Sequence, residues 1–330
     1  MEKRDPVTTK IKHFRAGTRF EMRKFALVYN GGGIGDYIHW TTAIRYVLDT
    51  YDYIEGYIIT PSFFADLAKL WLTPHPRFEL RISEEYEKEP YLEDIPCVVP
   101  LRNQYANAGG FHLFELGFIY FNQNKNIPIG YREIPRIEGN EADISAFDLP
   151  ERYAVITVMA TADNRRLDSK LINSLISFYN QKGITPVLLG KEVITETYRA
   201  RAPKGIRGQF IDLRNKTTLL EAAVILSKAH SVIGLDNGLL HLAACSSVPV
   251  VFLYTTVEPS YRNPPRRPGA KTIVITPTAD LPCRFCQTNM RYLIHDFKSC
   301  VYGDNICTEF EPAAIFKVLN ESLFKENDGN

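Results

Sequence analysis

Two successions of buried-strand patterns alternate with helical patterns along this chain of 330 residues. Runs such as YAVITVMA (153–160) and VPVVFLY (248–254) are apolar at almost every position, and segments with helical periodicity separate them. Strands that are apolar on both faces need cover on both sides, which parallel sheets in α/β proteins provide. The sequence therefore predicts doubly wound α/β domains, each built on a parallel sheet.

The two successions also predict two domains, because 330 residues exceed the usual size of a single core. In the first succession we expect strands at 24–30, 56–60 and 97–100, with helices at 36–49, 63–72 and 111–121. In the second we expect strands at 153–160, 184–190, 209–213, 230–235 and 248–254, with helices at 168–181, between 190 and 209, at 218–229 and from 238, and a last helix at 312–324. The polar, turn-rich stretch 137–152 is the predicted linker. We therefore expect an N-terminal domain of residues 1–148 and a C-terminal domain of residues 149–330.

The charge and hydropathy of the chain bear on whether it binds nucleic acid or a membrane. The net charge of +1 gives no support for nucleic-acid binding, although Arg262, Arg266 and Arg267 with the basic N-terminus leave that alternative open. Residues 1–24 hold eight Lys or Arg against three acids, which indicates solvated surface or, alternatively, a basic arm for an anionic acceptor or a peripheral membrane contact. We expect a cytoplasmic protein, because neither a secretory signal nor a membrane-length apolar stretch is visible.

The stretch VYNGGGIGDYIHW (28–40) places a glycine-rich loop between a predicted strand and a predicted helix. A dinucleotide-binding loop needs Gly-x-Gly-x-x-Gly, but counting from Gly31 the third position falls on Asp36. That carboxylate would repel a pyrophosphate. A carboxylate at a helix start is instead stabilised as an anion that can accept a proton, or it only complements the helix dipole.

A second loop follows the strand that ends at Leu235. Asp236, Asn237 and Gly238 lead into a helix whose first turn carries His241. The backbone N–H groups at this helix start can bind an anion such as a diphosphate, with His241 on the same face. Alternatively, Asp236 or Asn237 only caps the helix and His241 packs in the core.

These segments resemble glycosyltransferase family 9, the ADP-heptose:lipopolysaccharide heptosyltransferases. DNGLLHLAA (236–244), VPVVFLY and TVEPSYRNP (256–264) are similar to the family's nucleotide-sugar segment, and GDYIHWTTAI (35–44) is similar to its N-terminal loop. Two departures concern the donor: Asn237 stands where the family has Thr, and Tyr254-Thr255 replaces Phe-Gly.

The resemblance implies a GT-B fold, in which two Rossmann-like domains with parallel sheets face a central cleft. It implies an inverting glycosyltransferase with Asp36 as the general base and Gly33 and Gly35 beside the acceptor. His39 also fits the family pattern, although it could equally be a hydrogen-bonded helix residue. The residues implied to contact the donor are Arg165, Arg166, Glu192 (or Glu196), Asp236, Asn237, Gly238, His241 and Thr256.

The expected donor is a nucleotide-diphosphate sugar, with an ADP-sugar favoured and a heptose as one candidate. The expected acceptor is a hydroxyl of a glycan or a protein. We expect no catalytic metal, because a helix dipole and basic side chains can offset the charge of the leaving diphosphate. The alternatives are a nucleotide-sugar epimerase of the same fold and a non-catalytic nucleotide-sugar-binding module.

Four cysteines, Cys283, Cys286, Cys300 and Cys307, fall within 25 residues before the last predicted helix. Four thiolates can enclose a zinc or iron ion in a closed structural site, and the alternative is four reduced free thiols. Several members of the resembled family carry a similar segment. Such a site would be structural, because four protein ligands leave no open position for catalysis.

Overall fold

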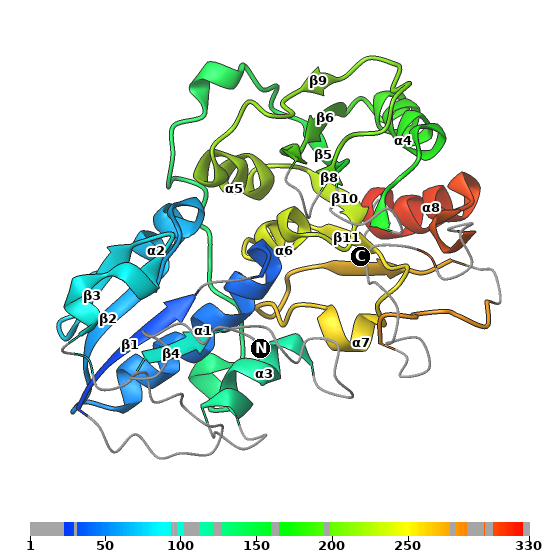
Figure 1. Cartoon of the computed structure of the whole chain (residues 1–330). Helices are drawn as coiled ribbons and strands as arrows, with labels where there is room; N and C mark the ends of the chain where they lie inside the picture. Colours follow the sequence, from blue (N-terminus) through cyan, green and yellow to red (C-terminus); the bar gives the residue numbers. More distant parts are fainter. Residues whose placement is uncertain are drawn as a thin grey trace, which may run out of the picture. The chain divides into compact units, whose positions relative to one another are not determined.

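The computed structural model describes residues 23–29, 32–93, 95, 98–101, 112–121, 127–159, 165–194, 199–277, 281–288, 300 and 306–325. This part of the chain divides into two compact units, the first ending at Pro135 and the second beginning at Arg136 (Figure 1). The backbone N–H of Ile137 donates to the carbonyl oxygen of Cys245 at 2.8 Å, so the start of the expected linker 137–152 is bonded to the second unit.

The first unit contains a four-stranded parallel sheet with the order β3-β2-β1-β4. Its strands are β1 (Lys24–Tyr29), β2 (Glu55–Thr60), β3 (Phe78–Ile82) and β4 (Val98–Leu101). Its helices are α1 (Ile34–Thr50), α2 (Ala65–Leu72) and α3 (Leu113–Tyr120). The central strand β1 buries residues 26–29, as its uninterrupted apolar sequence predicts.

The second unit contains a six-stranded parallel sheet with the order β12-β11-β10-β5-β6-β9. Its strands are β5 (Tyr153–Thr157), β6 (Thr185–Leu189), β9 (Ile211–Asp212), β10 (Ser231–Leu235), β11 (Val250–Leu253) and β12 (Thr272–Ile275). Its helices are α4 (Ser169–Gln181), α5 (Leu219–Ser227), α6 (Gly238–Ala244), α7 (Pro259–Arg262) and α8 (Pro312–Leu319), with a π-helical turn at Asn320–Phe324.

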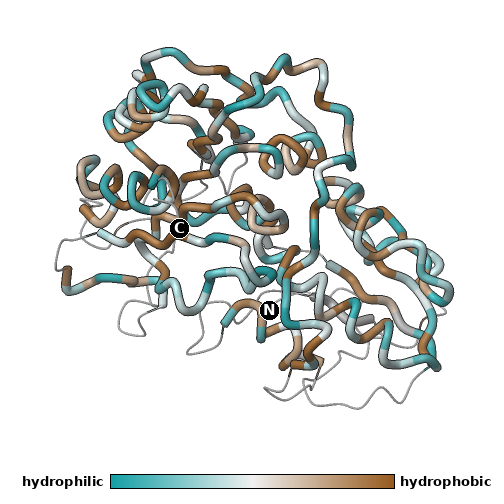
Figure 2. The backbone as a smooth tube through the Cα atoms, turned by 180° about the vertical axis from the view of Figure 1, so that it is seen from behind, coloured by the Kyte–Doolittle hydropathy of each residue, from teal (hydrophilic) through white to brown (hydrophobic). Residues whose placement is uncertain are grey.

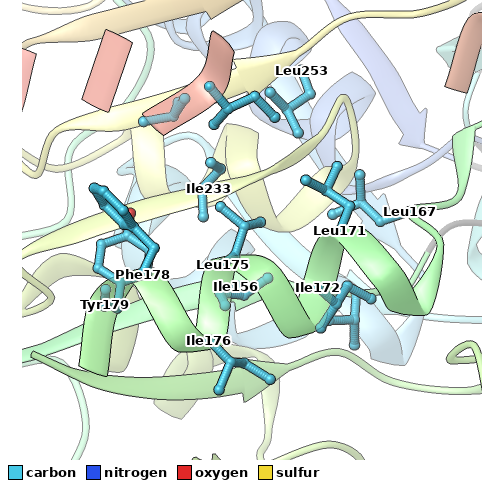
Figure 3. Close-up of a cluster of buried hydrophobic side chains, with 14 of the residues drawn as sticks. Ile156, Leu167, Leu171, Ile172, Leu175, Ile176, Phe178, Tyr179, Ile233 and Leu253 are labelled. Atoms are coloured by element: carbon cyan, nitrogen blue, oxygen red, sulfur yellow. The ribbon is translucent and has the colours of Figure 1, made fainter. Parts of the chain in front are cut away.

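The core of the second unit lies between α4 and the sheet. Leu171, Leu175 and Phe178 of α4 are buried together with Ile156 and Ile233 of the strands (Figure 3). Helix α8 lies beside α4 (Figure 1), where the Phe316 and Phe178 rings stack with centroids 4.6 Å apart. Hydrophobic and hydrophilic stretches alternate along the backbone (Figure 2), as the amphipathic helices of such a fold require.

Most predicted strands and helices are confirmed, including the strand at 153–160 as β5 and the helix at 36–49 as α1. Two strands escaped prediction: β3, which is half polar, and β12, which is only four residues long. The helix expected between 190 and 209 is wrong, because the described residues there form an antiparallel pair, β7 (Val193–Ile194) with β8 (Arg199–Ala200). β-branched residues favour strands at this position, and Pro203 disfavours a continuing helix.

A membrane-crossing helix is not found among the described residues, since none of their helices is both long and apolar enough.

Candidate active site

The candidate donor site lies at the carboxyl edge of the second sheet, where β5, β10 and β11 end side by side. Asp236 follows β10 directly and is buried, with a side chain only 7% exposed. His241, one turn into α6, is also buried, and its Nε2 lies 2.9 Å from Oδ1 of Asp236. An ionised carboxylate only accepts hydrogen bonds, so Nε2–H of His241 donates to Asp236.

The charges of two arginines act on this buried pair. Nη1 of Arg165 lies 3.9 Å from Oδ2 of Asp236, and its side chain is 28% exposed. Burial alone would raise the pKa of Asp236, but the hydrogen bond from His241 and the charges of Arg165 and Arg262 lower that pKa to about 2. The site therefore holds an ionised carboxylate that is stabilised by His241 and by the charges of two arginines. Arg262 belongs to the TVEPSYRNP segment, which was the sequence signal for it.

Asn237 is the N-cap of α6. Its Oδ1 accepts from the backbone N–H groups of Leu239 at 3.0 Å and Leu240 at 3.2 Å, and its Nδ2 donates to Oγ1 of Thr157 at 3.0 Å. The capping alternative is therefore the one observed for this residue. Two of the amides expected to bind phosphate are occupied by the cap, while Gly238 at the first helical position is half-buried. Thr157, which the sequence analysis missed, ties the cap to the end of β5.

The loop after β11 is buried against this cluster. Tyr254 and Thr256 have hydroxyl oxygens that are buried and lack a hydrogen-bond partner among the residues that the structure describes. Burial, followed by the neighbouring Asp236 carboxylate, raises the pKa of Tyr254 well above its usual range, against an opposing effect of Arg262. Unpaired buried hydroxyls cost about 1–3 kcal/mol each, and such costs are concentrated at functional sites.

Glu192, expected to contact the donor, is exposed in the loop after β6. Its backbone N–H donates to Oδ1 of Asn215 at 2.6 Å, and the N–H of Asn215 donates to the carbonyl of Gly190 at 2.9 Å. Asn215 adopts a left-handed conformation with φ of 61°, which asparagine tolerates better than most residues. The alternative residue, Glu196, lies outside the described residues, and Arg166 is half-buried beside Arg165.

The side chain of Arg266 is bonded to the backbone of neighbouring segments. Its guanidinium donates to the carbonyl oxygens of Ala244 at 3.0 Å, Ser246 at 2.8 Å, Val248 at 2.6 Å and Lys271 at 2.6 Å. These bonds tie the end of α6 to the segments that lead into β11 and β12. The nucleic-acid alternative for Arg266 is therefore not supported, because this guanidinium already serves backbone carbonyls.

In the first unit, Asp36 lies in the first turn of α1 and is half-buried. Its Oδ2 accepts from the backbone N–H of Gly33 at 2.8 Å, and the Tyr29 hydroxyl donates to the carbonyl of Gly33 at 3.2 Å. Gly32 has φ of +107°, and a Cβ there would lie 2.6 Å from the Tyr29 hydroxyl, so the loop requires glycine at this position. Gly33 is exposed and Gly35 is buried.

His39 is fully buried in α1. Its ring centroid lies 5.9 Å from that of His112 and 6.1 Å from that of Phe114, both at the start of α3. This is the environment of a packed core residue, in contrast to the half-buried Asp36 three residues earlier.

The four cysteines of the predicted metal cluster are not joined in disulfides, and all are half-buried. Burial first, and then the thiols of Cys286, Cys300 and Cys283, raise the pKa of Cys307 to about 12, so the four groups influence one another electrostatically. Within the described residues, however, no group of three or more His, Cys, Asp or Glu side chains is arranged to hold a metal ion.

Three solved structures that share this fold are glycosyltransferases. TibC of enterotoxigenic E. coli, an iron-containing dodecameric heptosyltransferase in complex with ADP-D-β-D-heptose, superimposes with a TM-score of 0.66 at 16% identity, over 91% of this chain and 76% of that one. E. coli ADP-heptose lps heptosyltransferase II superimposes with a TM-score of 0.58 at 16% identity, over 91% of this chain and 98% of that one. A family 9 glycosyltransferase of Veillonella parvula superimposes with a TM-score of 0.63 at 12% identity, over 92% of this chain and 98% of that one. The fold is therefore GT-B, as expected.

Sequence comparison gives the family. The sequence profile of glycosyltransferase family 9 (heptosyltransferase) matches residues 123–292, slightly more than half of the chain, and the chain belongs to this family. Lipooligosaccharide heptosyltransferase 2 of Haemophilus influenzae is 31% identical over 99 residues, which are 29% of this chain and 28% of that protein. The match therefore spans less than one third of the length of this relative.

Proposed function

We propose that this chain is an inverting glycosyltransferase that moves a sugar from a nucleotide-diphosphate donor to an acceptor hydroxyl. The observation that carries the proposal is the buried Asp236–His241 pair at the carboxyl edge of the second sheet, with Arg165 3.9 Å from Asp236 and the charge of Arg262 acting on it. Ligands of open α/β sheets bind at that edge, and a family 9 chain needs a nucleotide-sugar site there.

The two arginines are the groups best suited to the diphosphate. A guanidinium presents a planar pair of donors that matches phosphate oxygens, and it stays charged throughout the reaction. Asp236 bonds His241 through one oxygen and lies near Arg165 on the other, so it orients both side chains. Because Asn237 occupies two helix amides, most of the diphosphate charge falls to Arg165 and Arg262 in this proposal, with Gly238 allowing close approach. Thr256, Glu192 and Arg166 complete the proposed donor set.

The reaction proceeds as a single displacement in this proposal. The acceptor oxygen forms a bond to the anomeric carbon on the face opposite the diphosphate, and its proton passes to Asp36. The bond from the anomeric carbon to the diphosphate oxygen breaks, and the diphosphate leaves with the electron pair. Arg165 and Arg262 offset the charge that develops on it. Asp36 is preferred to His39 as the base because His39 is fully buried.

The favoured donor is an ADP-sugar, with ADP-heptose as the first compound to test. The support is the family itself and the ADP-D-β-D-heptose in the TibC complex. The acceptor class is a glycan or protein hydroxyl, received beside the exposed Gly33. We further propose that turnover needs no added divalent cation, since arginines supply the positive charge at the leaving group.

Cys283, Cys286, Cys300 and Cys307 fit a structural zinc or iron ion by donor chemistry. Burial and the neighbouring thiols raise the pKa of Cys286 and Cys307, and a cation that binds the thiolate forms would offset this cost. TibC, which shares the fold, is described as iron-containing. We propose a structural ion at these cysteines, with no part in the transfer step. Elemental analysis of the purified protein tests this: one zinc or iron per chain that Cys300→Ser removes supports it, and a metal-free folded protein contradicts it.

The proposed activity is tested by Asp36→Asn, which keeps an oxygen for the Gly33 amide but removes the base. We expect kcat with ADP-heptose and a glycan acceptor to fall by about 10²–10⁴, while the dissociation constant of the donor changes by less than about twofold. Asp49→Asn is the matched control, since Asp49 lies on the same helix and its Oδ2 accepts from the Tyr131 hydroxyl at 2.9 Å. Transfer that survives Asp36→Asn would contradict the assignment. Conversion of the donor without any acceptor would indicate an epimerase.

A further inference from the structure

Two hydrogen bonds join the loop after β11 to the turn that carries the first two cysteines. We call residues 254–258 the donor loop and residues 282–288 the cysteine turn. The backbone N–H of Gln287 donates to the carbonyl of Thr256 at 2.8 Å. The backbone N–H of Glu258 donates to Oγ1 of Thr288 at 3.2 Å. Two neighbouring residues of the cysteine turn therefore hold two positions of the donor loop, about thirty residues earlier in the sequence.

The Thr288 hydroxyl has a bonding pattern that only a hydroxyl can supply. It accepts from the N–H of Glu258 and donates to the carbonyl of Phe285 at 3.0 Å, so it bridges the donor loop and the cysteine turn. Phe285 adopts a left-handed conformation with φ of 57°, which is unfavourable for an aromatic residue. The N–H of Thr288 donates to the same Phe285 carbonyl at 2.9 Å. The turn is therefore held in one conformation by its own bonds, and it presents Thr288 in a fixed place.

The donor loop carries groups that the donor needs. Thr256, whose carbonyl is bonded to Gln287, is almost completely buried. Glu258 is the residue before α7, so the bond to Thr288 fixes the start of the helix that carries Arg262. The charge of Arg262 acts on Asp236, the buried carboxylate of the candidate site. A substitution of Thr288 would therefore move Arg262, a proposed diphosphate contact, without changing any side chain that contacts the donor itself.

We propose that Thr288 is a positioning residue for donor binding, acting through the donor loop on Thr256 and Arg262. This inference rests on the proposed function for the identity of the ligand. It assigns the cysteine turn a role beyond the stability of the C-terminal segment, because the turn supplies the support for one side of the donor site.

The test compares Thr288→Val, which keeps the branched shape and removes the hydroxyl, with Thr288→Ser, which keeps the hydroxyl. We expect Thr288→Val to raise the KM for ADP-heptose about tenfold with a change in kcat below about threefold, because the half-buried Glu258 amide loses its partner and the loop shifts. Thr288→Ser should restore the wild-type KM. The control is Thr218→Val, which removes the hydroxyl that caps α5 and should lower the melting temperature without changing the KM.

Hydrogen exchange of a peptide covering residues 254–262, measured without ligand, separates this inference from the proposed function. Faster exchange in Thr288→Val but not in Thr288→Ser, together with the raised KM, supports the inference. A donor that binds wild type and Thr288→Val equally overturns it, and so does a Thr288→Ser variant that behaves like Thr288→Val. Failure of the wild type to bind any nucleotide sugar refutes the proposed function instead, since the exchange comparison does not depend on a donor. If Thr288→Val does not fold, Thr288→Ala takes its place in the same comparison.

Discussion

Replacing Asp236 by Asn should destabilise the protein in a way that depends on pH. The carboxylate is buried, accepts from Nε2 of His241 at 2.9 Å, and lies near Arg165. Asn has the same shape and can still accept from His241, but it carries no charge. The substitution therefore isolates the electrostatic contribution of the carboxylate from its packing.

The magnitude follows from the pKa of Asp236, which falls from an ordinary 3.8 to about 2 in the folded protein. One pKa unit corresponds to about 1.4 kcal/mol, so this shift contributes about 2 kcal/mol to the free energy of unfolding. Because the folded-state pKa is lowered, this stabilisation is fully present above about pH 4 and is lost as the pH falls from about 4 to about 2. Asp236→Asn should therefore cost about 2 kcal/mol at pH 7, and the difference from wild type should shrink towards pH 2.

Urea unfolding of both proteins between pH 3 and pH 7 measures this difference directly. Asp212→Asn is the control, because Asp212 is 37% exposed and its pairing with Arg214 is screened by solvent. That variant should change the free energy of unfolding by less than about 1 kcal/mol. An Asp236→Asn protein as stable as wild type at pH 7, or a difference that does not vary with pH, would refute the electrostatic reasoning.

Two other substitutions test the packing around the site. Gly234→Ala should cost about 1–3 kcal/mol by calorimetry and weaken donor binding, because the added Cβ would overlap Oγ1 of Thr157 and lie 2.9 Å from its carbonyl oxygen. An unchanged melting temperature would contradict the close contact between Gly234 of β10 and Thr157 of β5. Arg266→Lys should cost about 2–4 kcal/mol in chemical denaturation, since one ammonium group cannot replace a guanidinium that serves four carbonyls. Arg267→Lys, the control, should stay within about 0.5 kcal/mol of wild type, and equal effects of the two would contradict the structural role.

Much of the fold follows from the sequence because its strands are continuous apolar runs. Val155, Ile233 and Val251 are fully buried in β5, β10 and β11, the three strands whose ends border the candidate donor site. β3 escaped prediction because its sequence FELRI mixes charges with apolar residues, as a half-buried edge strand permits. A helix was expected between 190 and 209 because strands and helices alternate elsewhere in the domain. The β-branched residues there favour the observed antiparallel pair β7–β8 instead.

The candidate site could be located from the sequence but not resolved into roles. The motif placed Asp236, Asn237 and His241 together, and the structure bonds Asp236 to His241. Which residue caps the helix depends on side-chain rotamers. Oδ1 of Asn237 accepts from both helix amides while its Nδ2 donates to Thr157, a residue of a distant strand. The bond from Glu258 to Thr288 joins segments about thirty residues apart, so no local pattern reveals it.

Calorimetric titration with ADP-heptose measures directly whether Arg165 and Arg262, next to the buried Asp236–His241 pair, hold a nucleotide-diphosphate sugar. We expect saturable binding at one site per chain, weakened at least about tenfold by Arg165→Gln, because a charged hydrogen-bond donor to phosphate is lost. Absence of binding by ADP-, GDP-, UDP- and CDP-sugars alike, or binding that Arg165→Gln leaves unchanged, would contradict it.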